Sequence, residues 1–372
     1  MKVKKMLKNQ TVAVVIPAYN EETQIGKVIE TMPDFVDRIV IVNDMSKDKT
    51  SETILKYIEM EKYQNTPEIK TFQYTTDDPT GFDRATCVVM EKLAAEEKLY
   101  TPARVVNQKE NTDRIILIEH LENGGVGAAI ATGYKWCRDH AIACTAVMAG
   151  DGQMDPAELE GLCRPVLEEN IDYVKGNRLI HPSAPLMIPK VRFFGNSVLS
   201  ILTKIASGYW HVSDTQTGYT TISLKALRAI RLYDIYKRYG MPNDMLVKLN
   251  CAFCTLREIE IKPVYQVGEQ SKMKIKKVIP TVSALLFRSF FKRLYGKYLL
   301  RDFHPLFLLY HLAFLLLLLC IPYGIKTGYS ILTGSDIGVL PVLAFSFLFT
   351  MGLQSLFFAM WMDIQDNERL NK

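Results

Sequence analysis

The sequence has little of what would point to several common classes of protein. Its 372 residues carry a formal net charge of only +5, so charge does not indicate a nucleic-acid-binding protein. Its seven cysteines are scattered along the chain, which is typical of a reducing compartment. Residues 1–8 are basic but lead directly into a predicted strand, so we expect no secretory signal.

Two short motifs are present but incomplete. Cys251 and Cys254 have C-x-x-C spacing, yet no second Cys or His pair lies nearby, so two buried thiols are favoured over metal or redox chemistry. Gly125 and Gly127 begin a dinucleotide-binding pattern that lacks its third glycine and follows the third predicted strand rather than the first. A tight turn with close helix packing is favoured there, with Asn123 near a ligand as the alternative.

Apolar strands alternate with helices from about residue 11 to residue 174. Alternating units of this kind predict an α/β fold, in which a mostly parallel sheet has helices on both faces. Residues 63–113 interrupt the rhythm and are read as an insertion with one helix at 85–97. The predicted strands are residues 12–16, 38–42, 114–118 and 142–148.

Three of these strands end in polar side chains. The first runs into Tyr19, Asn20 and Glu21, and the second into Asn43 and Asp44. The fourth ends in a turn that carries three oxygen-bearing side chains, those of Asp151, Gln153 and Asp155. Because ligands lie beyond the carboxyl ends of parallel strands, we expect these groups to share one cleft. Such groups suit ribose hydroxyls, base N–H groups and a cation on a diphosphate, so the pattern indicates a nucleotide-sugar site.

Local capping is the alternative for two of these acidic residues. Asp44 could cap the following helix, but Ser46 and Asp48 already supply caps and leave Asp44 to face the cleft. Asp151, Gln153 and Asp155 are predicted to bind Mg²⁺ or Mn²⁺ together with diphosphate oxygens and water. A capping turn before Pro156 is the other reading of that segment.

The last hundred residues differ sharply from the rest. Residues 305–325 and 337–362 are almost wholly apolar, and each is long enough for a span of roughly 20 residues. Basic residues crowd before the first of them, so the positive-inside rule predicts that the large N-terminal domain and the tail both lie in the cytoplasm. Residues 287–301 are amphipathic and predict an interfacial helix, with a packed surface helix as the alternative. The cations expected to meet lipid headgroups lie on the arc opposite its apolar side chains, and they are Arg288, Lys292, Arg293, Lys297 and Arg301.

Six motifs occur in one order between about residues 12 and 274, and together they resemble glycosyltransferase family 2. The resemblance implies a GT-A fold and inversion at the anomeric carbon. The two C-terminal apolar segments narrow it to the branch that includes polyprenyl-phosphate glycosyltransferases. The motifs are residues 15–21 (VIPAYNE), 42–48 (VNDMSKD), 123–128 (NGGVGA), 151–156 (DGQMDP), 176–178 (GNR) and 214–219 (DTQTGY).

The resemblance also implies roles for individual residues. Pro17, Tyr19, Glu21 and Asp44 would hold the nucleoside, and Asp151 and Gln153 the metal. Arg178 would bind the acceptor phosphate or the donor diphosphate, which suits its planar fork of donors. Ser271 and Lys272 resemble a short motif that closes the site around the acceptor. In the family the metal motif often starts with a further aspartate, where this chain has Ala149.

The leading hypothesis is transfer of a hexose from a nucleotide sugar to a lipid phosphate. A phosphate acceptor needs no strong base, whereas a hydroxyl acceptor would need one, and Asp214 is then the best choice. The alternatives are a lipid-linked saccharide or polysaccharide acceptor, and an inactive membrane scaffold with the same fold. The expected partners are the donor, the lipid acceptor and the membrane, with no nucleic acid, and a homo-oligomer is open. The domains expected are residues 1–274, 275–303 and 304–372.

Overall fold

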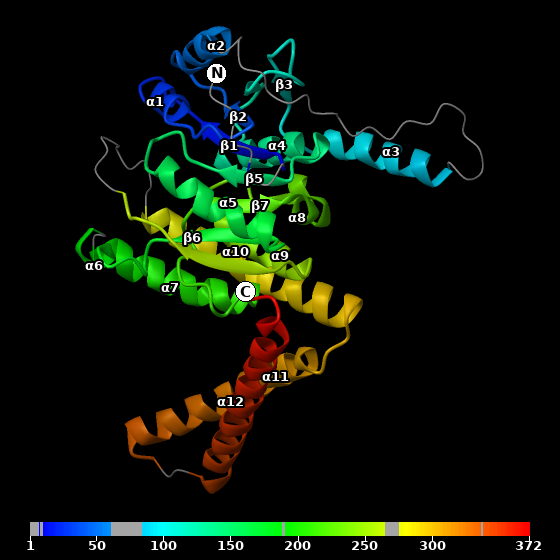
Figure 1. The fold of residues 1–372 in the computed structure, drawn as a ribbon. Helices are drawn as coiled ribbons and strands as arrows, with labels where there is room; N and C mark the ends of the chain where they lie inside the picture. The colour runs from blue at the N-terminus through cyan, green and yellow to red at the C-terminus, as the bar shows by residue number, and fades with distance from the viewer. Residues whose placement is uncertain (1–6, 8–9, 61–83, 188–189, 265–274, 336–337) are drawn as a thin grey trace.

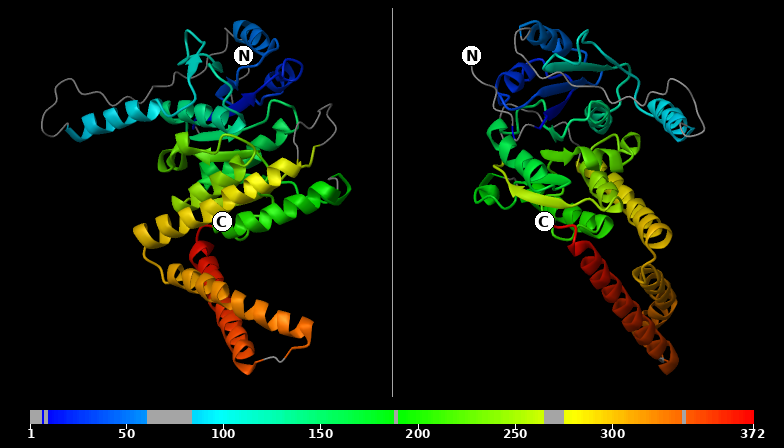
Figure 2. Two further views of the ribbon diagram at one scale, coloured as in Figure 1. Left: turned by 180° about the vertical axis from the view of Figure 1, so that it is seen from behind. Right: turned by 45° about the vertical axis from the view of Figure 1, so that its right-hand side comes forward.

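The computed structural model describes residues 7, 10–60, 84–187, 190–264, 275–335 and 338–372. An α/β domain forms the upper part of the molecule in Figure 1, and two long helices descend from it as a hairpin. Both termini of the described chain lie on the α/β domain, as the two views of Figure 2 show for the C-terminus in particular. The hairpin therefore leaves the domain and returns to it.

One eight-stranded sheet organises the α/β domain, in the order β3-β4-β2-β1-β5-β7-β6-β8. Neighbouring strands are parallel from β4 to β5 and again between β6 and β8, whereas β3 and β7 run antiparallel to their neighbours. The predicted mostly parallel sheet is confirmed. The strands are β1 (Val12–Ala18), β2 (Arg38–Asn43), β3 (Ala103–Val105), β4 (Ile115–His120), β5 (Cys144–Val147), β6 (Tyr173–Asn177), β7 (Thr220–Ser223) and β8 (Leu256–Glu260).

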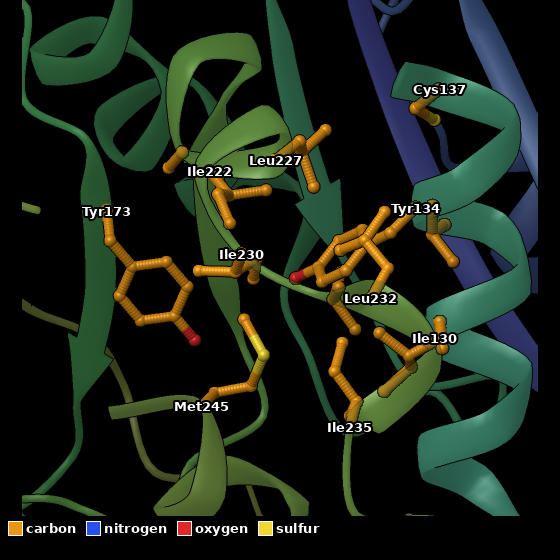
Figure 3. Packing of buried hydrophobic residues seen from close by; sticks show 14 of the residues in the cluster. Ile130, Tyr134, Cys137, Tyr173, Ile222, Leu227, Ile230, Leu232, Ile235 and Met245 are labelled. Atoms are coloured by element: carbon orange, nitrogen blue, oxygen red, sulfur yellow. The ribbon is translucent and has the colours of Figure 1, made fainter. Parts of the chain in front are cut away.

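Helices cover both faces of the sheet because its central strands are apolar on both sides. In β1, Val12 and Val14 belong to one core cluster, whereas Ala13 and Val15 belong to the other. Figure 3 shows part of the cluster that contains Ala13 and Val15, with the ring of Tyr134 among other side chains of that cluster. The helices of the domain are α1 (Ile25–Glu30), α2 (Thr50–Met60), α4 (Val126–Asp139), α5 (Leu159–Glu168), α6 (Ala184–Met187), α7 (Lys190–Ser207), α8 (Leu224–Ala229) and α9 (Met241–Cys251), with 3₁₀ turns η1 (Pro156–Glu158) and η2 (Leu232–Asp234).

The predicted insertion adds an edge strand and a projecting helix. β3 pairs antiparallel with β4 at the edge of the sheet. The helix predicted at 85–97 is α3 (Arg84–Glu97), which has no buried residue and extends away from the domain in Figure 1. Its apolar side chains are therefore not part of the core of the described chain.

Two C-terminal helices have the length and composition of membrane spans, namely α11 (Leu306–Thr333) and α12 (Val339–Glu368). They pack closely, since a Cβ at Gly352 would lie 2.9 Å from Leu317 Cγ. Before them come α10 (Ile275–Tyr295) and the π-helical turn η3 (Gly296–Arg301). A third core cluster joins this region to α7 and α9 through side chains that include Leu199, Val247 and Phe290.

The amphipathic segment is packed more deeply than the sequence predicts. Phe287 and Arg288 are exposed, as expected of an interfacial helix. The prediction that Arg293 and Lys297 meet lipid headgroups is wrong, because both side chains are buried in contacts with α12. Periodicity could not reveal this, since the acidic partners lie beyond the predicted end of the second apolar segment.

The chain after α12 returns to the sheet. Leu256 N donates to Leu370 O at 2.7 Å, and Lys372 N donates to Leu256 O at 3.0 Å. Asn371 thereby forms a parallel bridge with Leu256 of β8. The tail and the α/β domain therefore lie on the same side of the helical hairpin, as predicted.

Candidate active site

The loops after β1 and β2 are tied together by backbone–side-chain hydrogen bonds. Asn20 N donates to Ser46 Oγ at 2.9 Å, and Lys47 N donates to Asn20 Oδ1 at 2.8 Å. Glu21 N donates to Thr50 Oγ1 at 3.0 Å, at the start of α2. Asn20 has a φ of 56°, in the region that asparagine tolerates better than most residues. Two strand ends thus form one polar rim, from which Tyr19 projects with 39% of its surface exposed.

Asp44 joins this rim to the turn between β4 and α4. Its Oδ1 accepts from Gly124 N and its Oδ2 from Gly125 N, each at 2.7 Å. His120 Nδ1 lies 2.7 Å from Asp44 Oδ1, and Asn123 Nδ2 donates to the Asp44 carbonyl at 3.1 Å. Burial alone would raise the pKa of Asp44, but the hydrogen bonds from His120, Gly124 and Gly125 outweigh it and lower that pKa. Asp44 is therefore an ionised anchor with most of its acceptor sites in use.

The glycines in the turn between β4 and α4 allow close packing. Gly125 has a φ of 88°, and a Cβ at Gly127 would lie 2.0 Å from the carbonyl oxygen of Tyr236. Gly127 N also donates to Lys237 O at 2.9 Å. The favoured reading of this motif is confirmed: its glycines allow a tight turn and a close helix–loop approach. Asn123 is exposed beside it.

The turn after β5 lies between the β1 loop and the β6–β7 region. A Cβ at Gly150 would lie 3.4 Å from Pro17 O and 3.7 Å from Glu21 Cγ. On its other side, Tyr219 Oη donates to Asp155 O at 2.9 Å. The ends of β1, β2, β4 and β5 and the loop before β7 therefore adjoin one another at the edge of the sheet where the sequence predicts a cleft.

Within this turn, Asp151 has the character expected of a cation ligand. Burial raises the pKa of its carboxyl against hydrogen bonds from the backbone N–H groups of Gln153 and of Asp151 itself. No basic side chain forms an ion pair with it in the described part of the chain. A half-buried carboxylate without a cationic partner, next to the Gln153 amide, fits Mg²⁺ or Mn²⁺ together with donor oxygens.

Asp155 has a different set of contacts. Its Oδ1 accepts from Ala157 N at 2.9 Å and caps η1, and its Oδ2 lies 3.6 Å from Lys262 Nζ. The capping alternative is therefore confirmed for Asp155. Among the described residues no group of three or more His, Cys, Asp or Glu side chains could hold a metal ion. The protein's share of a metal site would thus consist of Asp151 and Gln153.

Arg178 and Asp214 form a bidentate ion pair on the far side of this cleft. Arg178 Nε lies 2.8 Å from Asp214 Oδ2, and Arg178 Nη2 lies 3.1 Å from Asp214 Oδ1. The side chain of Asp214 is 1% exposed, whereas that of Arg178 is 23% exposed. The pair therefore combines a partly exposed arginine side chain with a buried carboxylate.

Asp214 is also held by its own loop. Its Oδ1 accepts from Gln216 N and Thr217 N, each at 3.2 Å. Burial would raise the pKa of Asp214, but the charge and hydrogen bonds of Arg178, helped by the charge of Lys175, lower it. A carboxylate with a lowered pKa and both oxygens engaged is a weak base. The geometry therefore fits the reading of Asp214 as a loop cap better than the reading of Asp214 as a general base.

Sequence reasoning missed two residues of this charged cluster, Lys175 and Glu258, and a third residue, His120, beside Asp44. Lys175 is fully buried and donates to Thr217 O, and burial lowers its pKa to about 8 against the nearby charges of Asp214 and Glu258. Glu258 accepts from Asp214 N at 3.0 Å, and His120 binds Asp44 as described. A lone lysine in the apolar strand β6 was a usable signal. Glu258 gave none, because it lies in an ordinary alternating strand.

The structure thus brings together most of the predicted site. The donor-side residues Pro17, Tyr19, Glu21, Asp44, Asn123, Asp151 and Gln153 lie on adjoining loops, and Arg178 and Asp214 adjoin them through the loop before β7. Ser271 and Lys272 lie outside the described residues.

Comparison with known proteins agrees with this geometry. The model of the family described as "Glycosyl transferase family 2" matches residues 13–72 and 98–231. A UDP-N-acetylglucosamine–dolichyl-phosphate N-acetylglucosaminyltransferase of Methanococcus voltae is 27% identical over 258 residues, covering 69% of this chain and 87% of that protein. A dolichyl-phosphate beta-glucosyltransferase of Trichomonas vaginalis is 23% identical over 299 residues, covering 76% of this chain and 74% of that protein.

Among solved structures, glucosyl-3-phosphoglycerate synthase of Mycobacterium tuberculosis, in complex with Mn²⁺, UDP and glucosyl-3-phosphoglycerate, aligns with a TM-score of 0.46 and 14% identity. The alignment covers 77% of this chain and 80% of that one.

Proposed function

The chain belongs to glycosyltransferase family 2, and from that premise we propose that it transfers a hexose from a nucleotide sugar to a polyprenyl phosphate. The acceptor would be dolichyl or undecaprenyl phosphate, presented at the cytoplasmic face of a membrane. The glycosidic bond from the anomeric carbon to the donor diphosphate breaks as a bond to the acceptor phosphate oxygen forms, with inversion. The relatives that carry dolichyl-phosphate transferase names support this choice of acceptor.

The observation that carries the proposal is the state of Asp214. Both of its oxygens bind Arg178, and two backbone N–H groups of its own loop bind Oδ1 as well. A general base needs a pKa suited to proton removal and a free acceptor oxygen, whereas Arg178 lowers the pKa of Asp214 and binds both of its oxygens. A phosphate acceptor is already ionised near neutral pH, so it fits a site whose best-placed carboxylate is engaged in this way.

On the donor side, Arg178 would bind phosphate oxygens through the exposed part of its guanidinium while Asp214 fixes its orientation. Asp151 and Gln153 would hold Mg²⁺ or Mn²⁺. Bound there, the metal would neutralise charge that develops on the departing nucleoside diphosphate. Asp155, which caps η1, would support the turn rather than bind the metal.

The nucleoside would lie over the rim formed by the β1 and β2 loops. Tyr19 is exposed there and offers an aromatic face, while Pro17 and Glu21 border the Asp151 turn. Asp44 would act mainly by fixing the Gly124–Gly125 turn, with Asn123 exposed beside it. We keep the prediction that Ser271 and Lys272 close the site on the acceptor.

The membrane side of the proposal rests on α11 and α12, with mean hydropathies of 2.3 and 1.8 in their most apolar windows. The basic residues before α11 support a cytoplasmic position for the α/β domain under the positive-inside rule. The tail that returns to β8 supports a hairpin with two spans, because an even number of spans returns the chain to the same side.

The test uses purified protein in detergent, with Mg²⁺ or Mn²⁺, a panel of radiolabelled UDP- and GDP-sugars, and dolichyl or undecaprenyl phosphate. Label that enters the lipid phase in the wild type, and not in Asp151→Ala, is the expected result. A matched control is Asp139→Ala, which changes an acidic residue at the end of α4, away from the cleft loops.

Two outcomes would contradict the proposal. Donor hydrolysis or transfer to added saccharide without lipid labelling would move the acceptor to a saccharide. Absence of donor binding by calorimetry, together with absence of transfer with any sugar, would favour an inactive scaffold. The alanine at position 149 would then be consistent with that loss of activity.

A further inference from the structure

A second buried Arg–Asp pair lies far from the cleft, where α10 meets the end of α12. Arg293 Nη1 and Nη2 donate to Asp363 Oδ1 and Oδ2, each at 2.7 Å, and both side chains are 0% exposed. This pair is not part of the proposed chemistry, so its burial needs another explanation.

Arg293 also binds the α/β domain. Its Nε donates to Ala206 O at 2.9 Å and its Nη2 to Ile205 O at 3.0 Å. These carbonyls belong to the last turn of α7, where helix carbonyls lack partners within the helix. A Cβ at Gly208, which follows that turn with a φ of 78°, would lie 2.7 Å from Arg293 Nη1. One guanidinium therefore joins α7, α10 and α12.

A lysine one turn later makes a parallel junction. Lys297 Nζ donates to Asn367 Oδ1 at 2.6 Å and to Asn250 Oδ1 at 3.0 Å, and it lies 3.2 Å from Asp366 Oδ2. Asn250 Nδ2 also donates to Asn367 Oδ1 at 2.7 Å, so α9 contacts α12 directly. We call the residues Arg293, Asp363, Lys297, Asn367 and Asn250 the junction cluster.

The tail extends this junction to the sheet that carries the site. Asn371 pairs with Leu256 of β8, and β8 pairs in parallel with β6 along its length. β6 ends directly before Arg178, and Glu258 of β8 accepts from Asn177 Nδ2 at 2.7 Å. A continuous set of hydrogen bonds therefore runs from the end of α12 to the strand that positions Arg178.

Buried ion pairs are weak evidence for stability, because desolvation offsets most of their attraction and apolar replacements are often as stable. Their directional hydrogen bonds do restrict how the joined elements can be oriented. The junction cluster accordingly suits a part of the molecule whose orientation, rather than its stability alone, matters.

We propose that the junction cluster consists of positioning residues, which hold the α/β domain in one orientation on the membrane hairpin so that a lipid-anchored phosphate reaches Arg178. This inference rests on the proposed function. It concerns only acceptors that the membrane holds in place, since a soluble acceptor can approach the cleft from any direction.

The experiment compares two acceptors in one preparation of full-length protein in phosphatidylcholine vesicles. One is undecaprenyl phosphate embedded in the vesicles, and the other is the short, water-soluble geranyl phosphate. The test variant is the double substitution Arg293→Met and Asp363→Asn, which nearly keeps side-chain volume without leaving a lone buried charge. The matched control is Arg164→Met, which removes an exposed, ion-paired cation from α5.

In the double variant we expect the ratio of kcat/KM for the embedded acceptor to that for the soluble one to fall about tenfold or more. Donor hydrolysis and transfer to geranyl phosphate should stay near wild type, and Arg164→Met should leave the ratio unchanged. A role confined to folding would lower both activities together.

A second variant guards against misfolding. Ending the chain after Leu370 keeps that buried side chain but removes the bridge at Asn371 and the bond from Lys372 N. We expect the same selective fall, smaller in size. A ratio within about twofold of wild type in the folded variants would overturn the inference. If the wild type labels neither acceptor, the proposed function fails instead.

Discussion

The described part of the molecule contains two bidentate Arg–Asp pairs with nearly the same internal geometry and different surroundings. Arg178 and Asp214 meet at 2.8 and 3.1 Å, and Arg293 and Asp363 at 2.7 Å twice. The arginine of the first pair is 23% exposed, whereas that of the second is 0% exposed. The second arginine also donates to two helix carbonyls.

The difference in exposure indicates different roles for the two arginines, one in binding and the other in joining structural elements. A guanidinium that keeps part of its surface exposed, with its orientation fixed by a buried carboxylate, is prepared to bind an anion. A guanidinium whose donors bind carbonyls of α7, the Asp363 carboxylate of α12 and, at 3.3 Å, Tyr298 Oη of η3 joins those elements. Exposure, rather than the ion pair itself, distinguishes the two roles.

The largest expected effect comes from breaking the fully buried pair. Arg293→Met leaves Asp363 buried and unpaired, which typically costs about 3–5 kcal/mol of folding free energy. Denaturant unfolding followed by tryptophan fluorescence in detergent measures this cost, with Arg288→Met as the control. A loss below about 1 kcal/mol, the range of exposed pairs, would show that the pair is not buried as described.

The exposed pair should respond in rate instead. Arg178→Met removes a donor aimed at developing phosphate charge, so kcat should fall by about 10²–10³. Arg178→Lys should recover only part of this loss, because an ammonium cannot form the bidentate fork. The matched control is Arg164→Met, an exposed ion-paired arginine on α5. A change in KM for the donor without a change in kcat would assign Arg178 to ground-state binding.

The charge of Lys175 should make the turnover rate depend on pH. Below its pKa of about 8 the cluster holds the cations Lys175 and Arg178 and the carboxylates Asp214 and Glu258. Above it the ammonium is neutral, so both carboxylates compete for Arg178. The turnover rate should therefore fall as pH rises through about 8. Lys175→Arg stays charged and should move this fall to higher pH.

Stability should change in the opposite direction across the same range. The folded pKa of Lys175 is lowered from 10.5 to about 8, so between these values the unfolded chain binds more protons. The free energy of unfolding then rises with pH in this window as far as Lys175 contributes. Unfolding measured at both ends of the range separates loss of charge from loss of fold. A rate loss that Lys175→Arg does not shift would assign the titration to another group.

Much of the fold could be predicted because its signals are local. The apolar runs at residues 12–16 and 38–42 became β1 and β2, and the polar residues after them met in one cleft, because parallel strands share an edge. The two apolar C-terminal segments likewise became α11 and α12. Composition and periodicity determine such elements almost without tertiary context.

The roles of Arg293 and Asp214 could not be predicted in the same way, because they depend on partners distant in sequence. Arg293 looked like a lipid-facing cation because Asp363, 70 residues later, lay beyond the predicted apolar segment. Asp214 looked equally suited to catalysis and capping until Arg178 and the loop N–H groups were placed around it. Periodicity assigns a side chain to a face of its element, but what covers that face is a tertiary property.

The most direct test of the account is the lipid-labelling rate of Asp214→Asn relative to wild type between pH 5 and pH 8. Asparagine keeps one acceptor oxygen for Arg178 and removes any capacity to act as a base. For an already ionised acceptor and a positioning role, we expect a loss of about tenfold or less, with an unchanged pH dependence on the acid side. A loss of about 10²–10⁴ that also abolishes an acid limb seen in the wild type would identify Asp214 as the general base and contradict the phosphate acceptor.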